Sequence, residues 1–84
     1  MEVASLNPKI KKKINRHNLK KKFSKQIFLL KQNPFYPSLH LELLEPKSYG
    51  VYSFRIDRKF RAIFIFREDK QLIEILNITA HYND

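Results

Sequence analysis

The chain contains 84 residues, of which 43% are hydrophobic, and it has no cysteine. This length and apolar content predict a single small domain over residues 1–84 and exclude a wholly disordered chain. The lack of cysteine excludes disulfides and Cys-based zinc sites and fits a reducing compartment. We expect a cytoplasmic protein, because no apolar run approaches the roughly 20 residues of a membrane span and the N-terminus lacks the apolar segment of a signal peptide.

The charge is strongly basic, with 17 Lys and Arg against 8 Asp and Glu, which gives a net charge of +9. Residues 1–31 contain ten of the basic residues and one acid, Glu2. Such a field attracts polyanions or an acidic protein partner, although the alternative is a helix surface that lysines simply keep soluble. If the partner is a polyanion such as RNA, the candidate contacts are Lys11, Lys12, Lys13, Lys20, Lys21, Lys22 and Lys25.

In chain order, residues 2–5 are compatible with a short first strand, and a helix is expected from Pro8. Asn7 is a suitable N-cap, and proline suits the first helical position because it has no N–H to leave unpaired. Asn18 tolerates the left-handed conformation that ends a helix, and a second helix follows to about residue 31. Its apolar face consists of Leu19, Phe23, Ile27 and Leu30. The two segments predict a helical hairpin with lysines on its outer surface.

Three later segments, 51–56, 60–66 and 72–79, are rich in β-branched and aromatic residues, which is typical of strands. The short links at 57–59 and 68–70 favour hairpins, so the three segments predict an antiparallel meander. The segment HLELL before them is too short to assign. The predicted fold class is therefore α+β, with a short first strand, a helical hairpin and then an antiparallel β-meander.

Three-residue hairpin loops determine which residues face one another in this meander. The opposing pairs on this register are Arg55–Arg61, Ser53–Ile63, Arg61–Asn77, Ile63–Ile75 and Ile65–Ile73. Because side chains alternate along a strand, one face becomes large and apolar and should pack against the helices. It contains Tyr52, Phe54, Ile56, Phe60, Ala62, Phe64, Phe66, Leu72, Leu76 and Ile78. Glu74 also falls on this face, which the pattern does not explain.

The opposite face of the predicted sheet is divided into an apolar end and a polar end. The apolar end consists of Ile63, Ile65, Ile73 and Ile75. Four exposed isoleucines predict a surface for a protein partner, with core beneath a loop or the first helix as the alternative. The polar end consists of Ser53, Arg55, Arg61, Asn77, Thr79 and His81.

The polar end has the side chains that chemistry on a phosphate requires. Two facing arginines repel each other unless both point into water or an anion lies between them, and arginine suits phosphate because its planar fork donates two parallel hydrogen bonds. His81 can give or take a proton near neutral pH, and Tyr82 can stack on a base. An RNA strand supplies its own nucleophile, the 2′-OH, so we expect no metal or cofactor. The sequence also has no carboxylate cluster suited to Mg²⁺ and no His/Cys metal spacing.

The segments NPFYPSLHLELL, YGVYSFRIDRKFRAIFIF and LIEILNITAHYND resemble, in this order and spacing, the RelE/ParE superfamily of toxins from bacterial toxin–antitoxin pairs. The similarity extends over roughly residues 5–84. It implies an α+β fold with a first strand, a helical hairpin and an antiparallel meander. It also implies a cognate antitoxin, which for a chain of this charge would be acidic.

RelE-like and YoeB-like members of this superfamily cleave mRNA in the ribosomal A site without a metal. The 2′-OH attacks the adjacent phosphate and leaves a 2′,3′-cyclic phosphate and a 5′-OH end. By position, the resemblance implies that Arg61 and Arg55 stabilise the phosphate and that His81 is the general acid. Tyr82 would stack or orient the substrate beside it. The general base stays open, and its candidates are Glu45, whose spacing differs from that of the family, and Lys47.

Two alternatives to the hypothesis of an mRNA-cleaving toxin remain. ParE-like members share the fold but act on DNA gyrase and lack the catalytic set. A basic RNA-binding domain of this fold need not have any activity. The leading hypothesis is a toxin that cleaves mRNA on the ribosome and so inhibits translation.

Overall fold

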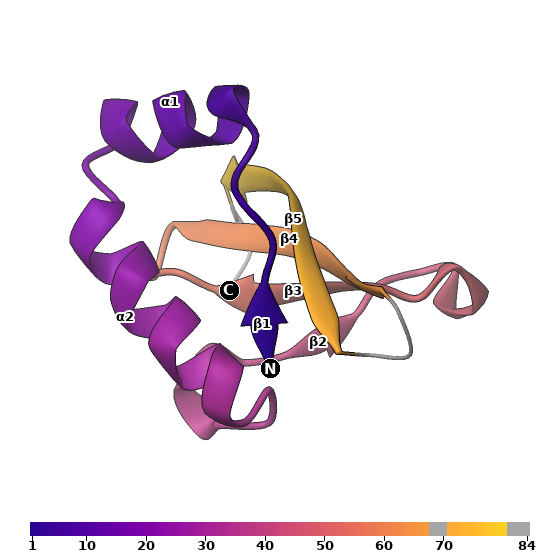
Figure 1. The fold of residues 1–84 in the computed structure, drawn as a ribbon. Coiled ribbons are helices and arrows are strands. Elements are labelled where there is room, and N and C mark those ends of the chain that lie inside the picture. Colours follow the sequence, from indigo (N-terminus) through magenta and orange to yellow (C-terminus); the bar gives the residue numbers. More distant parts are fainter. Residues whose placement is uncertain (68–70, 81–84) are drawn as a thin grey trace.

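The computed structural model describes residues 1–67 and 71–80, and their helices and strands form two layers (Figure 1). The elements are β1 (Glu2–Val3), α1 (Pro8–Arg16), α2 (Lys20–Gln32), the short 3₁₀ helix η1 (Pro37–Leu39), β2 (Glu42–Leu43), the 3₁₀ helix η2 (Lys47–Tyr49), β3 (Val51–Arg55), β4 (Phe60–Arg67) and β5 (Leu72–Ala80). The strands form one sheet in the order β1-β5-β4-β3-β2, in which β1 is parallel to β5 and the other neighbours are antiparallel. This arrangement confirms the predicted α+β fold class.

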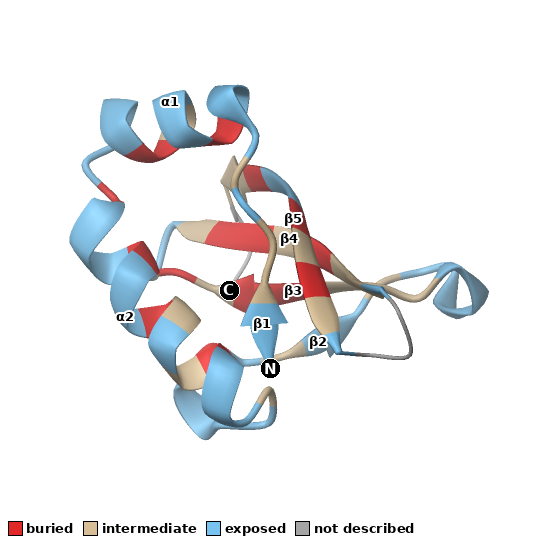
Figure 2. Cartoon of the chain, in the orientation of Figure 1, coloured by how far each residue is buried: buried red, intermediate tan, exposed pale blue. Residues whose placement is uncertain are grey.

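The helical hairpin follows the sequence pattern. Asn7 Oδ1 accepts a hydrogen bond from the Lys9 N–H at 2.8 Å, and Pro8 is the first residue of α1. Between the helices, Asn18 has a φ of 54°, in the left-handed region. Figure 2 shows that both helices turn buried residues toward the sheet and exposed ones outward, so the predicted hairpin is confirmed. Neither helix of the described residues has the length and hydrophobicity that a bilayer crossing requires.

The core lies between the helices and the sheet. Its largest fully buried side chains are Leu19, Leu30, Leu39, Phe54, Phe64 and Ile73. Phe54 is central, since its ring centroid lies 6.2 Å from that of Phe23 on α2 and 5.8 Å from that of Phe64 on β4. Burying one such side chain contributes about 1.5–3 kcal/mol. These contacts determine which face of the sheet is turned away from the helices, here called the far face.

The β3–β4 hairpin has the predicted register, in which Arg55 lies opposite Arg61. Its turn contains no glycine, and Asp57 stabilises it instead. Asp57 Oδ1 accepts hydrogen bonds from the backbone N–H groups of Lys59 and Phe60, both at 2.8 Å. Asp side chains commonly stabilise turns in this way. The turn therefore determines the register that brings the two arginines together.

Removing the Asp57 carboxylate should destabilise the fold, by about 1–2 kcal/mol for Asp57→Ala at neutral pH. Burial alone would raise the pKa of Asp57, but the Lys59 and Phe60 hydrogen bonds and the Lys22 ammonium, 3.1 Å away, together lower that pKa. The stabilisation is therefore present above the unfolded-state pKa of about 3.9 and is lost as the pH falls through the folded-state pKa. Urea unfolding at pH 7 and at pH 2 measures this, and an equal difference between variant and wild type at both pH values would contradict it.

The β4–β5 register differs from the prediction because β5 contains a β-bulge. Ile63 pairs with Asn77 but Phe64 pairs with Ile75, so Leu76 is an extra residue between the two pairs. One extra residue exchanges the two faces for every residue before it in β5. Leu76, predicted in the core, is therefore 42% exposed. The predicted pairings Arg61–Asn77, Ile63–Ile75 and Ile65–Ile73 are wrong.

The bulge also removes half of the predicted isoleucine surface. Ile73 and Ile75 are buried in the core, at 0% and 5% exposure, so the prediction of one exposed four-isoleucine surface is wrong. The two that remain on the far face, both half-buried, are Ile63 and Ile65. Glu74 and Leu72 move from the predicted apolar face to the far face. Glu74 Oε1 forms an ion pair there with Arg67 Nη1 at 2.9 Å, which accounts for its place in a strand pattern that otherwise favours apolar residues.

Candidate functional site

Two arginines occupy opposing positions on the far face, and their surroundings differ. Arg61, on β4, is buried with 6% of its surface exposed, whereas Arg55, on β3, is half-buried. Two like charges at opposing positions repel each other across the ladder. Their proximity therefore requires compensating groups, which for Arg61 include a carboxylate.

Arg61 is held by hydrogen bonds to Ser53 and His40 and by an ion pair with Glu42. Nε donates to Ser53 Oγ at 3.0 Å, and Nη2 donates to the His40 carbonyl at 2.6 Å. Nη2 also forms an ion pair with Glu42 Oε1 at 3.0 Å. Burial lowers the pKa of Arg61, the Glu42 carboxylate raises it and Arg55 lowers it further. Because arginine stays protonated in proteins, Arg61 is a fixed positive charge beneath the surface.

His40 contacts both arginines. Its Nε2 lies 3.4 Å from Arg55 Nη1, and its carbonyl is the one that accepts from Arg61. His40 follows η1 and has a φ of 46°, in the left-handed region that residues other than glycine seldom adopt. A guanidinium N–H can only donate, so Nε2 accepts from Arg55 in the tautomer that has the ring proton on Nδ1. In that neutral form an imidazole can take a proton from a hydroxyl group.

A cavity of about 360 Å³, here called the basic groove, lies beside Arg55. It is lined by Lys22, Lys25, Gln26, Ser38, His40, Arg55, Ile56, Asp57 and Arg58. Its one carboxylate, Asp57, is paired with Lys22 at 3.1 Å. Gln26 Nε2 donates to the Ser38 and Arg55 carbonyls at 3.1 and 2.7 Å, which joins α2 to the end of β3. A concave surface with this excess of positive charge attracts anions such as phosphate.

No model of a known protein family matches the sequence, and no curated protein matches it either. Solved structures do match. A YoeB/ParE toxin from Agrobacterium tumefaciens is 19% identical, and the superposition covers 98% of this chain and 100% of that one with a TM-score of 0.73. The chain has the YoeB/ParE toxin fold.

Two further matches are YoeB–YefM toxin–antitoxin complexes from Staphylococcus aureus. One is 25% identical, with a TM-score of 0.66, and the other, a heterotetrameric complex, is 22% identical, with a TM-score of 0.67. Each match covers 94% of this chain and 100% of the other. Together the three structures confirm the resemblance to the RelE/ParE superfamily at the level of the fold.

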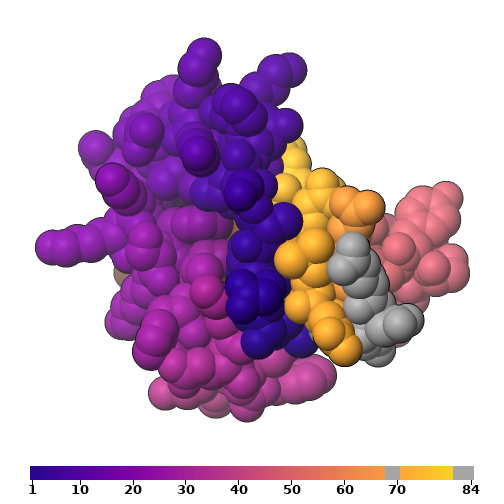
Figure 3. Space-filling model, viewed as in Figure 1, coloured from indigo at the N-terminus to yellow at the C-terminus, as the bar shows by residue number. Residues whose placement is uncertain are grey.

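The YoeB/ParE-type sheet does not bring every predicted catalytic residue to the arginines. The Leu44 N–H donates to the carbonyl of Val51, the first residue of β3, at 2.8 Å. The residues after Leu44 therefore lie beyond the start of β3. Glu45 and Lys47 are exposed in the connection that projects from the sheet at that end (Figures 1 and 3). Arg55 ends β3 on the other side, about 13 Å from Val51 at a rise of roughly 3.3 Å per residue. Glu45 and Lys47 are therefore separated from the arginines.

His81 and Tyr82 lie outside the described residues. The described part of β5 ends at Ala80, and Thr79 lies opposite Arg61. The roles of general acid for His81 and of a stacking group for Tyr82 stay predictions.

The seven lysines predicted to bind RNA differ in their surroundings. Lys22 and Lys25 line the basic groove. Lys13 Nζ donates to Asn77 Oδ1 and to the Ile78 carbonyl, both at 3.0 Å, which ties α1 to β5. The remaining ones, all exposed on the two helices, are Lys11, Lys12, Lys20 and Lys21. Only two of the seven therefore lie beside the arginines.

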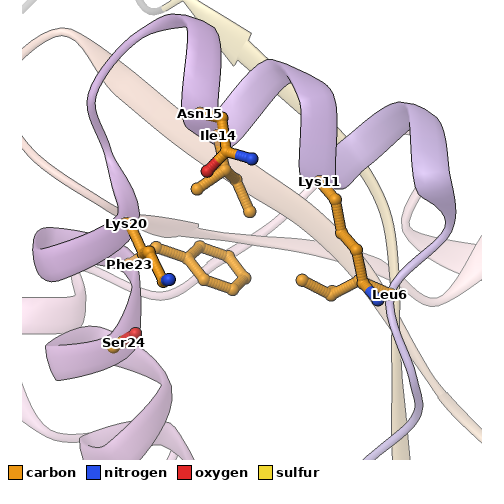
Figure 4. A pocket seen from close by; sticks show the side chains of 7 residues that line it. All are labelled: Leu6, Lys11, Ile14, Asn15, Lys20, Phe23 and Ser24. Carbon is orange, nitrogen blue, oxygen red and sulfur yellow. The ribbon is translucent and has the colours of Figure 1, made fainter.

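A separate cavity, also of about 360 Å³, lies between the two helices (Figure 4). Its apolar wall consists of Leu6, Ile14 and Phe23, and Lys11 and Lys20 flank it. Asn15 and Ser24 complete its lining. None of these residues lines the basic groove, so this cavity is not part of the site.

His40 and Glu42 are functional candidates that the sequence interpretation missed. Three histidines far apart in the sequence show no pattern, and HLELL was too short to assign. Its pairing with β3 places Glu42 opposite Ser53 and so beside Arg61. The signal that could have found Glu42 is physical, because a buried arginine requires a carboxylate partner and few acids are available in this basic chain.

Proposed function

We propose that the protein is the toxin of a toxin–antitoxin pair and that it cleaves mRNA on the ribosome. The observation that supports this best is the meeting of Arg55, Arg61 and His40 at one end of the far face. The solved structures that share the fold are toxins, two of them in complex with YefM. An acidic antitoxin as the partner is further supported by the net charge of +9.

In the proposed reaction, the scissile phosphate binds Arg55 at the side of the basic groove. The 2′-OH of the preceding ribose attacks phosphorus, and His40 Nε2 takes the hydroxyl proton. The bond between phosphorus and the 5′-oxygen breaks, and the general acid, proposed to be His81, protonates the leaving oxygen. The products are a 2′,3′-cyclic phosphate and a 5′-OH end, and no other reactant is required.

His40 is proposed as the general base because it lies beside Arg55, whereas Glu45 and Lys47 do not. Glu45 and Lys47, the two candidates from the sequence, lie beyond the opposite end of β3. His40 lines the basic groove and lies 3.4 Å from Arg55 Nη1. A general base must be within hydrogen-bond reach of the proton that it removes, so geometry favours His40.

The two arginines would act in different ways. Arg55 is accessible from the basic groove and can donate hydrogen bonds to the phosphate directly. Arg61 already donates to Ser53 and His40 and pairs with Glu42, so we assign it a positioning role. Its fixed charge in a site partly shielded from water also stabilises the extra negative charge of pentacoordinate phosphorus.

The lysines on the outer surface of the helices would bind ribosomal RNA through phosphate contacts. Such contacts are weakened by salt and do not read sequence. A ribosomal target also implies a cytoplasmic protein. The exposed candidates for these contacts are Lys11, Lys12, Lys20, Lys21, Lys22 and Lys25.

Primer extension on ribosomes programmed with a defined mRNA tests the proposed function. Purified protein should create new mRNA 5′ ends inside the coding sequence, and the same mRNA without ribosomes should stay intact. Intact mRNA on programmed ribosomes would contradict the proposal. Loss of plasmid supercoiling by gyrase in a parallel assay would then favour the ParE-like alternative, and no effect in either assay would indicate an inactive RNA-binding domain.

A further inference from the structure

A second concave surface adjoins the basic groove and shares His40 with it. This cavity of about 420 Å³, here called the aromatic pocket, lies at the β2 edge of the sheet. It is lined by Phe35, Tyr36, Pro37, His40, Leu41, Leu43 and Tyr52. Phe35 and Tyr36 are 78% and 44% exposed. Exposed aromatic side chains around a concavity are typical of a binding site, since a few polar groups beside an apolar wall can orient a ligand.

The two exposed aromatic residues are held in place by the backbone around them. Asn33 Oδ1 accepts a hydrogen bond from the Phe35 N–H, and the Asn33 carbonyl accepts one from the Tyr36 N–H, both at 3.0 Å. Pro34 and Pro37 flank the pair and restrict its backbone. A backbone that is fixed before binding lowers the conformational entropy that is lost when a ligand binds.

A ligand that fits both cavities is flat and apolar at one end and anionic at the other. The aromatic pocket supplies ring faces, and the basic groove supplies Lys25, Arg55 and Arg58. Because His40 lines both cavities, the two ends of the ligand must be close together in its covalent structure. A nucleotide of single-stranded RNA meets this requirement, since one sugar separates its base from its phosphate.

We propose that the aromatic pocket binds one unpaired base of an RNA strand whose adjoining phosphate lies in the basic groove. The inference rests on RNA being the substrate, as proposed above, and adds where the base next to the scissile phosphate binds. Stacking on aromatic rings accepts every base but strengthens with the size of the ring system. Purines should therefore bind more tightly than pyrimidines at this one position.

The test is an NMR titration with an RNA trinucleotide that carries 2′-O-methyl groups throughout and so cannot be cleaved. The double variant Phe35→Ala/Tyr36→Ala should bind it roughly ten-fold more weakly than wild type, or weaker still. Each base is then replaced in turn by an abasic sugar. Wild type should bind one of these three probes more weakly than the intact trinucleotide, and the double variant should bind all of them as it binds the intact one. Phe28→Ala is the matched control, because Phe28 lies on α2, is 61% exposed and lines neither cavity. Its affinity for the trinucleotide should equal that of wild type.

Equal affinity of wild type and the double variant, or of wild type for the intact and abasic probes, would overturn the inference. An acidic aromatic peptide is the competitor. If it binds more tightly than the RNA and reverses the RNA-induced shifts of the Phe35 and Tyr36 resonances, the pocket belongs to a protein partner and the inference is overturned as well. The NMR titration measures binding without cleavage. If binding depends on the base in the titration but mRNA stays intact in the ribosome assay, only the proposed function is contradicted. Cleavage at the same codons and with the same KM in the double variant would contradict only the base pocket.

Discussion

Arg61→Met is expected to lower the free energy of unfolding by about 2–3 kcal/mol, and Arg67→Met by less than about 1 kcal/mol. Both arginines lie on β4 and on the far face, and they pair with carboxylates at nearly equal distances, 3.0 Å to Glu42 and 2.9 Å to Glu74. They differ in burial, since the side chain of Arg61 is 7% exposed and that of Arg67 is 55% exposed. Loss of Arg61 leaves buried acceptors without a donor, whereas water replaces the partners of Arg67.

Urea unfolding of the two variants measures this difference. Adding Glu42→Leu to Arg61→Met should recover little of the lost stability, because the Glu42 side chain is 56% exposed and water solvates its carboxylate once Arg61 is replaced. The loss comes instead from Ser53 Oγ and the His40 carbonyl, which no longer have the donor they had. Equal destabilisation by Arg61→Met and Arg67→Met would contradict the assignment of Arg61 as the centre of a buried network.

The parts of the fold that local rules determine could be predicted from the sequence. Asn7 and Pro8 define the start of α1, and the three-residue turn at 57–59 sets Arg55 opposite Arg61. Neither feature depends on residues far away in the chain. The side of the sheet on which both arginines lie also follows from alternation within two short strands.

The features that depend on long-range contacts could not be predicted. Leu76 looks like any other residue of an apolar strand, and nothing in the local pattern marks it as the extra residue of a bulge. The alternation rule therefore placed Ile73 and Ile75 on the wrong face. Glu42 reaches the site because a two-residue strand pairs with β3, and His40 lies between η1 and that strand. A segment that short has no periodicity to detect.

His40→Asn and Arg55→Gln are each expected to lower kcat/KM for mRNA cleavage by roughly 100-fold or more. Asparagine suits the φ of 46° at His40 and so preserves the carbonyl that accepts from Arg61, but it cannot take a proton from the 2′-OH. Both side chains lie at the surface of the basic groove, so the free energy of unfolding should change by less than about 1 kcal/mol. Primer extension under single-turnover conditions gives the rates, and urea unfolding checks the fold.

The matched control is His17→Asn, the same substitution at an exposed histidine that does not line the basic groove. The ring centroids of His17 and Phe60 are 4.7 Å apart. Its cleavage rate should equal that of wild type. In wild type, kcat/KM should rise with pH on the acidic side as the general base loses its proton, and His40→Asn should lose this rise while Arg55→Gln keeps it. A pH profile of His40→Asn that is lower but unchanged in shape would mean that His40 only positions the arginines. Because the imidazole contacts Arg55 and the carbonyl of the same residue contacts Arg61, only the shape of the profile separates proton transfer from positioning.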